Sequence, residues 1–331
     1  MLRRLPSIVR GFVPPAVLLF LSLVLAGCAS APAERLQLPA GYCAPPLPYR
    51  YNPAYSQHPD LDAALTPELL ARYPRRYLLT ANAVGILPVL QQIATVPASG
   101  PAGELALLKL RQRVLTQVTL ASSTVSSLAA ELDCEGERAD QLAVYLAGQD
   151  ESRVQRLNVL SIVIGALGGV GATVSQSRPA QYAFGIGGGV TAAGLGLLTL
   201  NQPGATARFE HPRNLLADVW AENPASAILP PGVWYLLTEP AFSNQGRTSI
   251  AHNTRQRWQH GGPLARPESD AGRQLTSLLF GAGGTYTAAQ LQLRANMLNE
   301  MQAAVRLLHQ ELLGLLLVLG EDEDAATGAA P

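Results

Sequence analysis

Four glycines follow an apolar run in the stretch SIVIGALGGVGATV, residues 161–174. Glycine has no Cβ atom, so it lets another group approach the backbone closely. Two kinds of site use that property. A glycine-rich turn after a strand binds the pyrophosphate of a dinucleotide at a helix N-terminus, whereas a glycine-rich helix face packs closely against a second helix. The neighbouring residues decide between these two interpretations.

Residues 163–174, VIGALGGVGATV, resemble the GxxGGVG turn of zinc-independent alcohol dehydrogenases and quinone reductases. The resemblance implies a nicotinamide cofactor, an amphipathic helix after the turn and an acidic residue about 20 positions later that binds the ribose. The segment SQSRPAQ follows the turn instead, and no Asp or Glu occurs between Glu151 and Glu210. We therefore expect no cofactor here and interpret the glycines as a helix-packing surface.

Other motifs that carry chemistry are missing from the sequence. No histidine belongs to an HExxH motif or has a second histidine four residues away, and neither a GxSxG nucleophile elbow nor a P-loop occurs. We therefore expect no metal site and no enzymatic activity. The alternative is an envelope hydrolase or ligand-binding lipoprotein whose site is assembled in space from residues 209–284. The five histidines are His58, His211, His252, His260 and His309.

The N-terminus has the features of a secretory signal. Three arginines among the first ten residues precede the apolar stretch 12–27, which ends in LAGC, Leu25 to Cys28. This order resembles the lipobox signal of bacterial lipoproteins. The resemblance implies cleavage before Cys28 and acylation of that cysteine, and two or more acyl chains anchor a protein stably. The alternative is an ordinary secretory signal. Ala29, in place of an aspartate, favours the outer membrane, with the body facing the periplasm.

Charge and cysteine content limit the partners. Residues 28–331 carry 21 basic and 24 acidic side chains, which argues against a nucleic-acid partner, because such a partner requires a basic face. The expected partners are membrane lipid, through acylated Cys28, and a protein or a second copy of the chain, through the helices. In an oxidising compartment Cys43 and Cys134 either form a disulfide or remain two free thiols, and both alternatives stay open.

The mature chain begins with a tether and a helical body. Residues 28–59 are rich in proline and tyrosine and are expected to be extended. In residues 60–156, apolar side chains recur at intervals of three, four and seven, which predicts a bundle or coiled-coil-like body. Its main element is one long helix, or two that meet near Gly136. The carboxylates around that glycine are interpreted as a solvated junction: Asp133, Glu135, Glu137 and Asp140.

Two uncharged stretches follow, residues 157–177 and 179–207, separated only by Arg178. They predict a glycine-rich apolar hairpin over 157–207, with two helices long enough to cross a bilayer. Small residues four apart predict a close helix pair. The hairpin either inserts into a membrane or is buried in the bundle. The glycines assigned to helix packing are Gly165, Gly169, Gly185, Gly189 and Gly196.

The rest of the chain is also predicted to be helical. Residues 208–284 suggest short helices joined by Pro/Gly turns, with Trp220, Trp234 and Trp258 as packing anchors. A final helix over 285–320 is expected to be capped by Thr285 or Thr287 and followed by a disordered acidic tail, 321–331. The class is therefore all-α. The expected role is that of a lipid-anchored envelope protein with a structural or protein-interaction function.

Overall fold

The computed structural model describes residues 41–45, 49, 55–58, 60–97, 100–200, 204–260, 262 and 264–327, with backbone alone for 200 and 323–327. The chain divides into two units, Met1–Leu36 and Gln37–Pro331, and every described residue belongs to the second. The predicted signal peptide (1–27) and Cys28 therefore lie outside the described residues.

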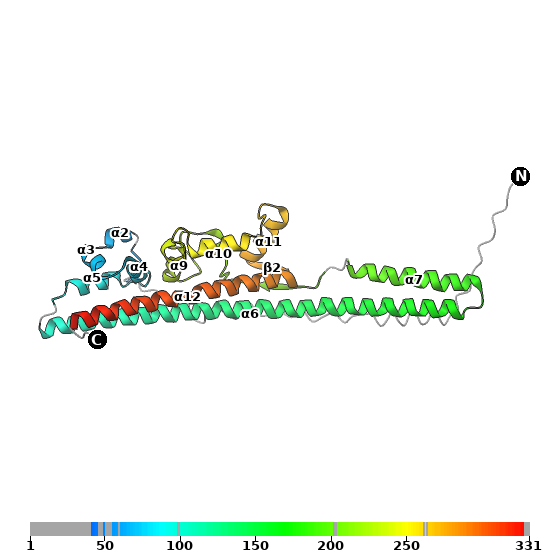
Figure 1. Ribbon diagram of the computed structural model, residues 1–331, viewed down its shortest axis with the longest axis horizontal. Coiled ribbons are helices and arrows are strands. Elements are labelled where there is room, and N and C mark those ends of the chain that lie inside the picture. The colour runs from blue at the N-terminus through cyan, green and yellow to red at the C-terminus, as the bar shows by residue number, and fades with distance from the viewer. Residues whose placement is uncertain are drawn as a thin grey trace. The chain divides into compact units, whose positions relative to one another are not determined.

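The all-α prediction is confirmed, because helices make up most of the described chain (Figure 1). The longest described elements are α6 and α12, followed by α7, and the short helices pack on α6 and α12. The elements in order are α2 (Leu61–Ala64), α3 (Pro67–Arg72), α4 (Arg75–Ala83), α5 (Leu87–Thr95), α6 (Pro101–Val174), α7 (Arg178–Leu200), β1 (Thr206–Glu210), α8 (Ala217–Ala221), α9 (Pro231–Thr238), η2 (Pro240–Phe242), α10 (Ile250–Gln259), α11 (Asp270–Phe280), β2 (Gly283–Thr287) and α12 (Ala288–Thr327).

Helix α6 is one unbroken helix of 74 residues, about 110 Å long at 1.5 Å per residue. Pro101 lies in its first turn, and the next proline in the sequence is Pro179, so no helix-breaking side chain interrupts it. Of the two alternatives, the break at Gly136 is wrong. A Cβ atom at Gly136 would lie 2.7 Å from Asn299 Oδ1, so this glycine allows α12 to approach α6 closely.

Helix α12 packs along the N-terminal part of α6 (Figure 1). It begins at Ala288, where the Thr287 hydroxyl accepts from the N–H of Gln290 and the Gln290 side chain accepts from the N–H of Thr287. These reciprocal bonds form a capping box. Helix α12 continues to Thr327, so the predicted disorder is wrong for residues 321–327. Near this end of α12, the carboxylate of Asp322 lies 2.7 Å from the guanidinium of Arg72, and the ion pair holds α12 to α3.

A two-stranded antiparallel ribbon was missing from the prediction. Strand β1 pairs with β2, with Thr206 opposite Thr287 and Glu210 opposite Gly283. Thr285, the other proposed cap, lies in β2. The two strands are five residues each and far apart in sequence, so no hairpin turn signals their pairing. Strand β1 follows α7 in the chain and strand β2 precedes α12, so their pairing brings together the segments next to these two helices.

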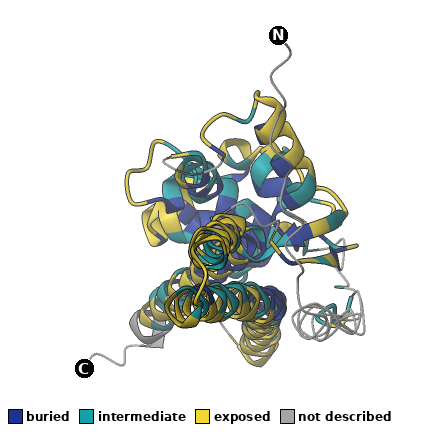
Figure 2. Ribbon diagram, turned by 90° about the vertical axis from the view of Figure 1, so that its right-hand side faces the viewer, coloured by how far each residue is buried: buried dark blue, intermediate teal, exposed yellow. Residues whose placement is uncertain are grey.

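The core lies where the short helices meet α6 and α12, as the buried residues in Figure 2 show. Trp234 and Trp258 are buried in it, and Trp220 stacks on Phe280 with ring centroids 4.3 Å apart. The prediction that the tryptophans are packing anchors is therefore confirmed. A second apolar cluster joins α3, α4 and α5 to the N-terminal part of α6.

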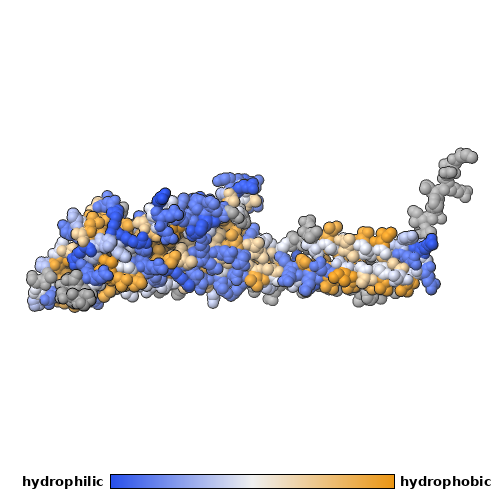
Figure 3. Space-filling model, in the orientation of Figure 1, coloured by the Kyte–Doolittle hydropathy of each residue, from blue (hydrophilic) through white to orange (hydrophobic). Residues whose placement is uncertain are grey.

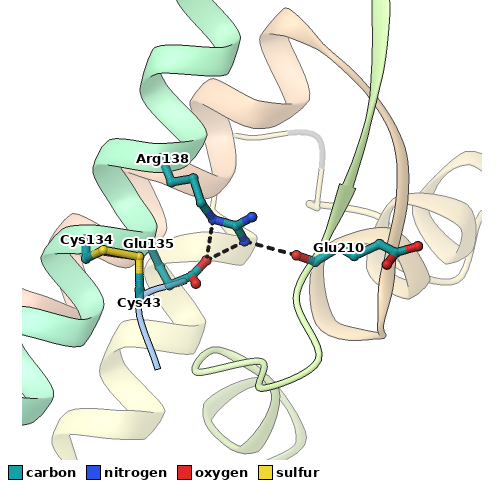
Figure 4. Close-up of a disulfide and its surroundings, with 5 residues drawn as sticks. All are labelled: Cys43, Cys134, Glu135, Arg138 and Glu210. Carbon is teal, nitrogen blue, oxygen red and sulfur yellow. Dashed lines mark hydrogen bonds and ion pairs between the residues drawn. A yellow bond between two sulfur atoms is a disulfide. The ribbon is translucent and has the colours of Figure 1, made fainter. Parts of the chain in front are cut away.

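The described part of the tether lies on the body. Cys43 forms a disulfide with Cys134 of α6, which is one of the two alternatives drawn from the sequence (Figure 4). The Tyr49 hydroxyl donates to Ser127 at 3.4 Å, and the Gln57 side chain donates to the carbonyl of Ala83 at 2.8 Å. These contacts fix Cys43, Tyr49 and Gln57 to the helical body.

Candidate functional site

The C-terminal part of α6 and α7 form the predicted helical hairpin. The two helices run antiparallel on either side of a turn at residues 175–177 (Figure 1). They approach most closely at Gly168 and Gly188, where a Cβ atom on either residue would lie 2.9 Å or 2.7 Å from the Cα atom of the other. Both positions therefore require glycine for this packing.

The structure corrects the list of packing glycines. Gly165 and Gly185 do face the opposite helix, because their Cβ positions would lie 3.6 Å from Ala192 and 3.7 Å from Ala172. The two positions in closest contact, Gly168 and Gly188, were not predicted.

Three predicted packing glycines, Gly169, Gly189 and Gly196, are wrong. A Cβ atom on any of them would have no described neighbour within 4 Å outside its own helix. Gly169 and Gly189 each follow a contact glycine by one residue. One residue rotates a helix by about 100°, which turns these positions away from the opposite helix.

The arms of the hairpin expose their apolar side chains. Of the three described helices that are long and apolar enough to cross a membrane by length and composition, α6 and α7 supply the two arms. Only 6% of the most apolar window of α6 is buried, and none of the α7 window is. Figure 3 shows this apolar surface on both arms. The alternative of a hairpin buried in the bundle is therefore wrong.

Charged residues mark both ends of the hairpin. Arg153 and Arg156 precede the uncharged part of α6, and Arg178 begins α7 at the tip. The base is closed by Asp150, whose carboxylate accepts from the N–H of Ala205 at 2.7 Å. The uncharged arms are thus framed by polar groups at their two ends, about one bilayer apart.

Of the four carboxylates near Gly136, Asp133 and Glu137 are exposed and Asp140 is half-buried, which agrees with the prediction, whereas Glu135 is not solvated. Glu135 is buried and lies 2.8 Å from the guanidinium of Arg138, which also donates to the carbonyl of Glu210 at 2.9 Å (Figure 4). The Arg138 guanidinium stacks over the ring of Phe209, with a distance of 4.0 Å to the centroid. The ion pair lies within α6 and compensates the buried Glu135, because an unpaired buried carboxylate would be costly. The bond from Arg138 to the carbonyl of Glu210 joins α6 to β1.

A second buried polar group lies around His211, which follows β1. Its Nε2 atom lies 2.9 Å from the Tyr286 hydroxyl, and that hydroxyl donates to the carbonyl of Leu278 at 2.6 Å. Because the hydroxyl uses its own hydrogen for Leu278, it accepts a hydrogen bond from Nε2 of His211. Nε2 therefore carries the imidazole hydrogen, and Nδ1 of the neutral ring carries none. Among the described residues Nδ1 is buried without a partner. Burial, and then the charge of Arg294, lower the pKa of His211 to about 3.

We expect this histidine to make folding pH-dependent. An unfolded histidine binds a proton near pH 6.5, whereas His211 stays neutral in the fold until about pH 3. The folded state therefore loses stability as the pH falls below 6.5. Between pH 7 and pH 5 the loss is about 2 kcal/mol. Chemical denaturation of the wild type and of His211→Asn at both pH values measures it. An equal pH dependence in the two proteins would contradict the assignment.

The region 209–284, proposed as the alternative site, contributes to two large hollows. One of about 710 Å³ lies between residues 242–260 and α12, and its lining includes His260 and the carboxylates of Glu300 and Glu311. The other, of about 770 Å³, lies beside α11 and is lined mostly by small, amide and leucine side chains, with Arg266 its one charged member. Within the described ranges no group of three or more His, Cys, Asp or Glu side chains could hold a metal ion. His252 pairs with Glu222 on the surface, at 2.6 Å.

Comparison of the chain with protein-family models, with curated proteins and with solved structures gives no match. The exposed apolar hairpin is therefore the feature from which a function is argued.

Proposed function

We propose that this chain is a lipid-anchored protein of the bacterial cell envelope with a structural or protein-interaction role, whose hairpin crosses a membrane. The observation that carries the proposal is the hairpin itself: two arms of membrane-spanning length whose apolar windows are almost wholly exposed. An exposed apolar surface of this extent is typical of membrane or protein contacts.

The backbone of the hairpin suits a bilayer. The uncharged part of α6, residues 157–174, is about 27 Å long, which is close to the thickness of the hydrocarbon core. Apart from the short turn, both arms are helical, so their backbone groups bond within each arm. The contact of Gly168 with Gly188 supplies the close packing that holds helices together in lipid. Arg178 then lies in the far interface, and Arg153 and Arg156 in the near one.

The length of the tether allows the lipid and the hairpin to share one membrane. Cys28 and Cys43 are 15 residues apart, so the chain between them spans at most about 50 Å. From Cys134 to Leu157, at the start of the uncharged arm, α6 rises by about 35 Å. An acyl chain on Cys28 therefore reaches the interface at the base of the hairpin. It does not reach the tip, which lies about 60 Å from Cys134. We place the lipid and the body on the same side of the membrane, with the outer membrane and a periplasmic body as the proposed location.

The test separates the hairpin from the lipid. Residues 1–28 are replaced by a cleavable secretory signal, and the mature N-terminus is verified by mass. We expect this protein to resist extraction of membranes with carbonate and with urea. The added pair Val163→Asp and Val190→Asp, on the exposed faces of the two arms, is expected to release it, since a carboxylate in hydrocarbon costs a few kcal/mol. Val144→Asp, equally exposed on the body part of α6, is the control and should stay bound. Complete extraction of the unsubstituted protein would contradict insertion.

A further inference from the structure

A second exposed apolar surface lies at the other end of α6. It consists of Leu108 and Leu115 of α6 with Leu313, Leu316 and Leu317 of α12, and we refer to it as the leucine groove. Four of the five side chains are more than half exposed, and Leu316 is 36% exposed. Leu115 and Leu316 line one hollow of about 140 Å³, so the two rows of leucines are neighbours.

The membrane that holds the hairpin cannot cover this surface. Leu108 lies 59 residues before Leu167 of the hairpin on the same helix, which is about 90 Å along the axis. A bilayer is about 40–45 Å thick with its headgroups. If the hairpin is inserted, the leucine groove therefore lies outside that membrane, and another surface must cover it.

We infer that the leucine groove is the dimer interface of this protein and that its occupant is a second copy of the chain. Helices α6 and α12 form an antiparallel two-helix layer, with the short helices packed against one side of it. Leu108 and Leu115 are seven residues apart on α6, which is the spacing of a helix-packing seam. Two such layers placed face to face form a four-helix bundle.

The symmetry of an inserted protein fixes the arrangement, and this step rests on the proposed function. Two copies with hairpins in one membrane are related by a two-fold axis along the bilayer normal, roughly parallel to α6. That axis places α6 of each copy against α12 of the other, at the same level.

Charge agrees with this arrangement. Exposed Lys109 lies beside the leucines of α6, and exposed Glu321 lies beside those of α12. Arg111 and Asp322 line the same hollow, which shows that these two stretches lie at one level along the helix pair. In the dimer, Lys109 of each copy therefore comes near Glu321 of the second copy, whereas a parallel contact of α6 with α6 would bring like charges together.

The experiment uses the full chain in mild detergent and in membranes. We expect the wild type to be a dimer by native mass spectrometry. Leu115→Glu combined with Leu317→Glu should convert it to a monomer, with at least a tenfold loss of dimer affinity, while Val144→Glu should leave the dimer intact. Thermal melting followed by circular dichroism verifies that each variant folds. A monomeric wild type, or a dimer that survives the double substitution, would overturn the inference.

A cross-link tests the register. Leu115→Cys and Leu317→Cys are made in separate copies, one of them tagged, and co-expressed. A disulfide between the two copies is expected on mild oxidation, and a pair of Val144→Cys with Leu317→Cys should give none. Carbonate extraction of the glutamate variant distinguishes the two proposals. A monomer that stays in the membrane supports both, whereas release of this variant would contradict insertion of the hairpin, because its lipid anchor and both arms are unchanged.

Discussion

Replacement of Gly168 with valine is expected to separate the two arms of the hairpin, whereas the same replacement at Gly169 is expected to leave them packed. A Cβ atom at Gly168 would lie 2.9 Å from both the Cα atom of Gly188 and the carbonyl oxygen of Phe184. These are backbone atoms, so no side chain can turn aside to make room. At Gly169 the same atom has no described neighbour within 4 Å outside its own helix. The two substitutions cost the same in helix propensity, so their difference reports packing alone.

A designed disulfide measures the separation. The Cβ position of Gly165 lies 3.6 Å from that of Ala192, which is within the range of natural disulfides. Gly165→Cys with Ala192→Cys should therefore cross-link within one chain and shift its mobility on a non-reducing gel. With Gly168→Val added, we expect at least a tenfold lower yield. With Gly169→Val added, the yield should not change. Equal yields in the two triple variants would show that the arms do not meet at Gly168.

Loss of the disulfide between Cys43 and Cys134 is expected to cost about 4 kcal/mol in the free energy of unfolding. The bond closes a loop of 91 residues, and the entropy that an unfolded chain recovers on opening such a loop has this magnitude. Cys43→Ser with Cys134→Ser also frees the chain before Tyr49 from α6. Denaturant unfolding of the double variant and of the reduced wild type should give the same decrease.

Proteolysis provides the second readout. Without the disulfide, the tether around Cys43 should be cleaved before the helices are. Exposed Ser123→Ala, on the same helix, is the matched control for substitution on α6. Unchanged stability of both the double variant and the reduced wild type would show that the bond does not hold the tether to the body.

The sequence predicted the hairpin well because its two signals, the absence of charge and the spacing of small residues, act locally. It predicted two of the glycines that face the opposite helix, Gly165 and Gly185, but missed the pair in closest contact. Gly168 and Gly188 are separated by the turn, and the register across that turn depends on where each helix ends. A one-residue change in register rotates the contact face by about 100°, and this is why Gly169 was predicted in place of Gly168.

The misassignment of one carboxylate, Glu135, has a different cause. Glu135 and its neighbours form a run of charge that is usually solvated, and nothing in the run shows that Arg138 three residues later turns the same way into the core. Arg138 pairs with Glu135 and also donates to the carbonyl of Glu210. That carbonyl belongs to a ribbon strand, and Glu210 lies 72 residues after Arg138 in the chain. Long-range pairing of this kind leaves no local pattern, and the same reason explains the missed strands.

The continuity of α6 has a mechanical consequence. From Pro101 to Val174 the helix has no proline and no break, so the body and one arm of the hairpin are parts of a single rod. Cys134 lies on that rod, and the disulfide joins it to the segment that leads to Cys28. If the hairpin and Cys28 are both held in a membrane, as we propose, tension on the hairpin passes along α6 to Cys134 and returns through the tether. The short helices lie outside this path, so a load on the anchors is not carried by their backbones.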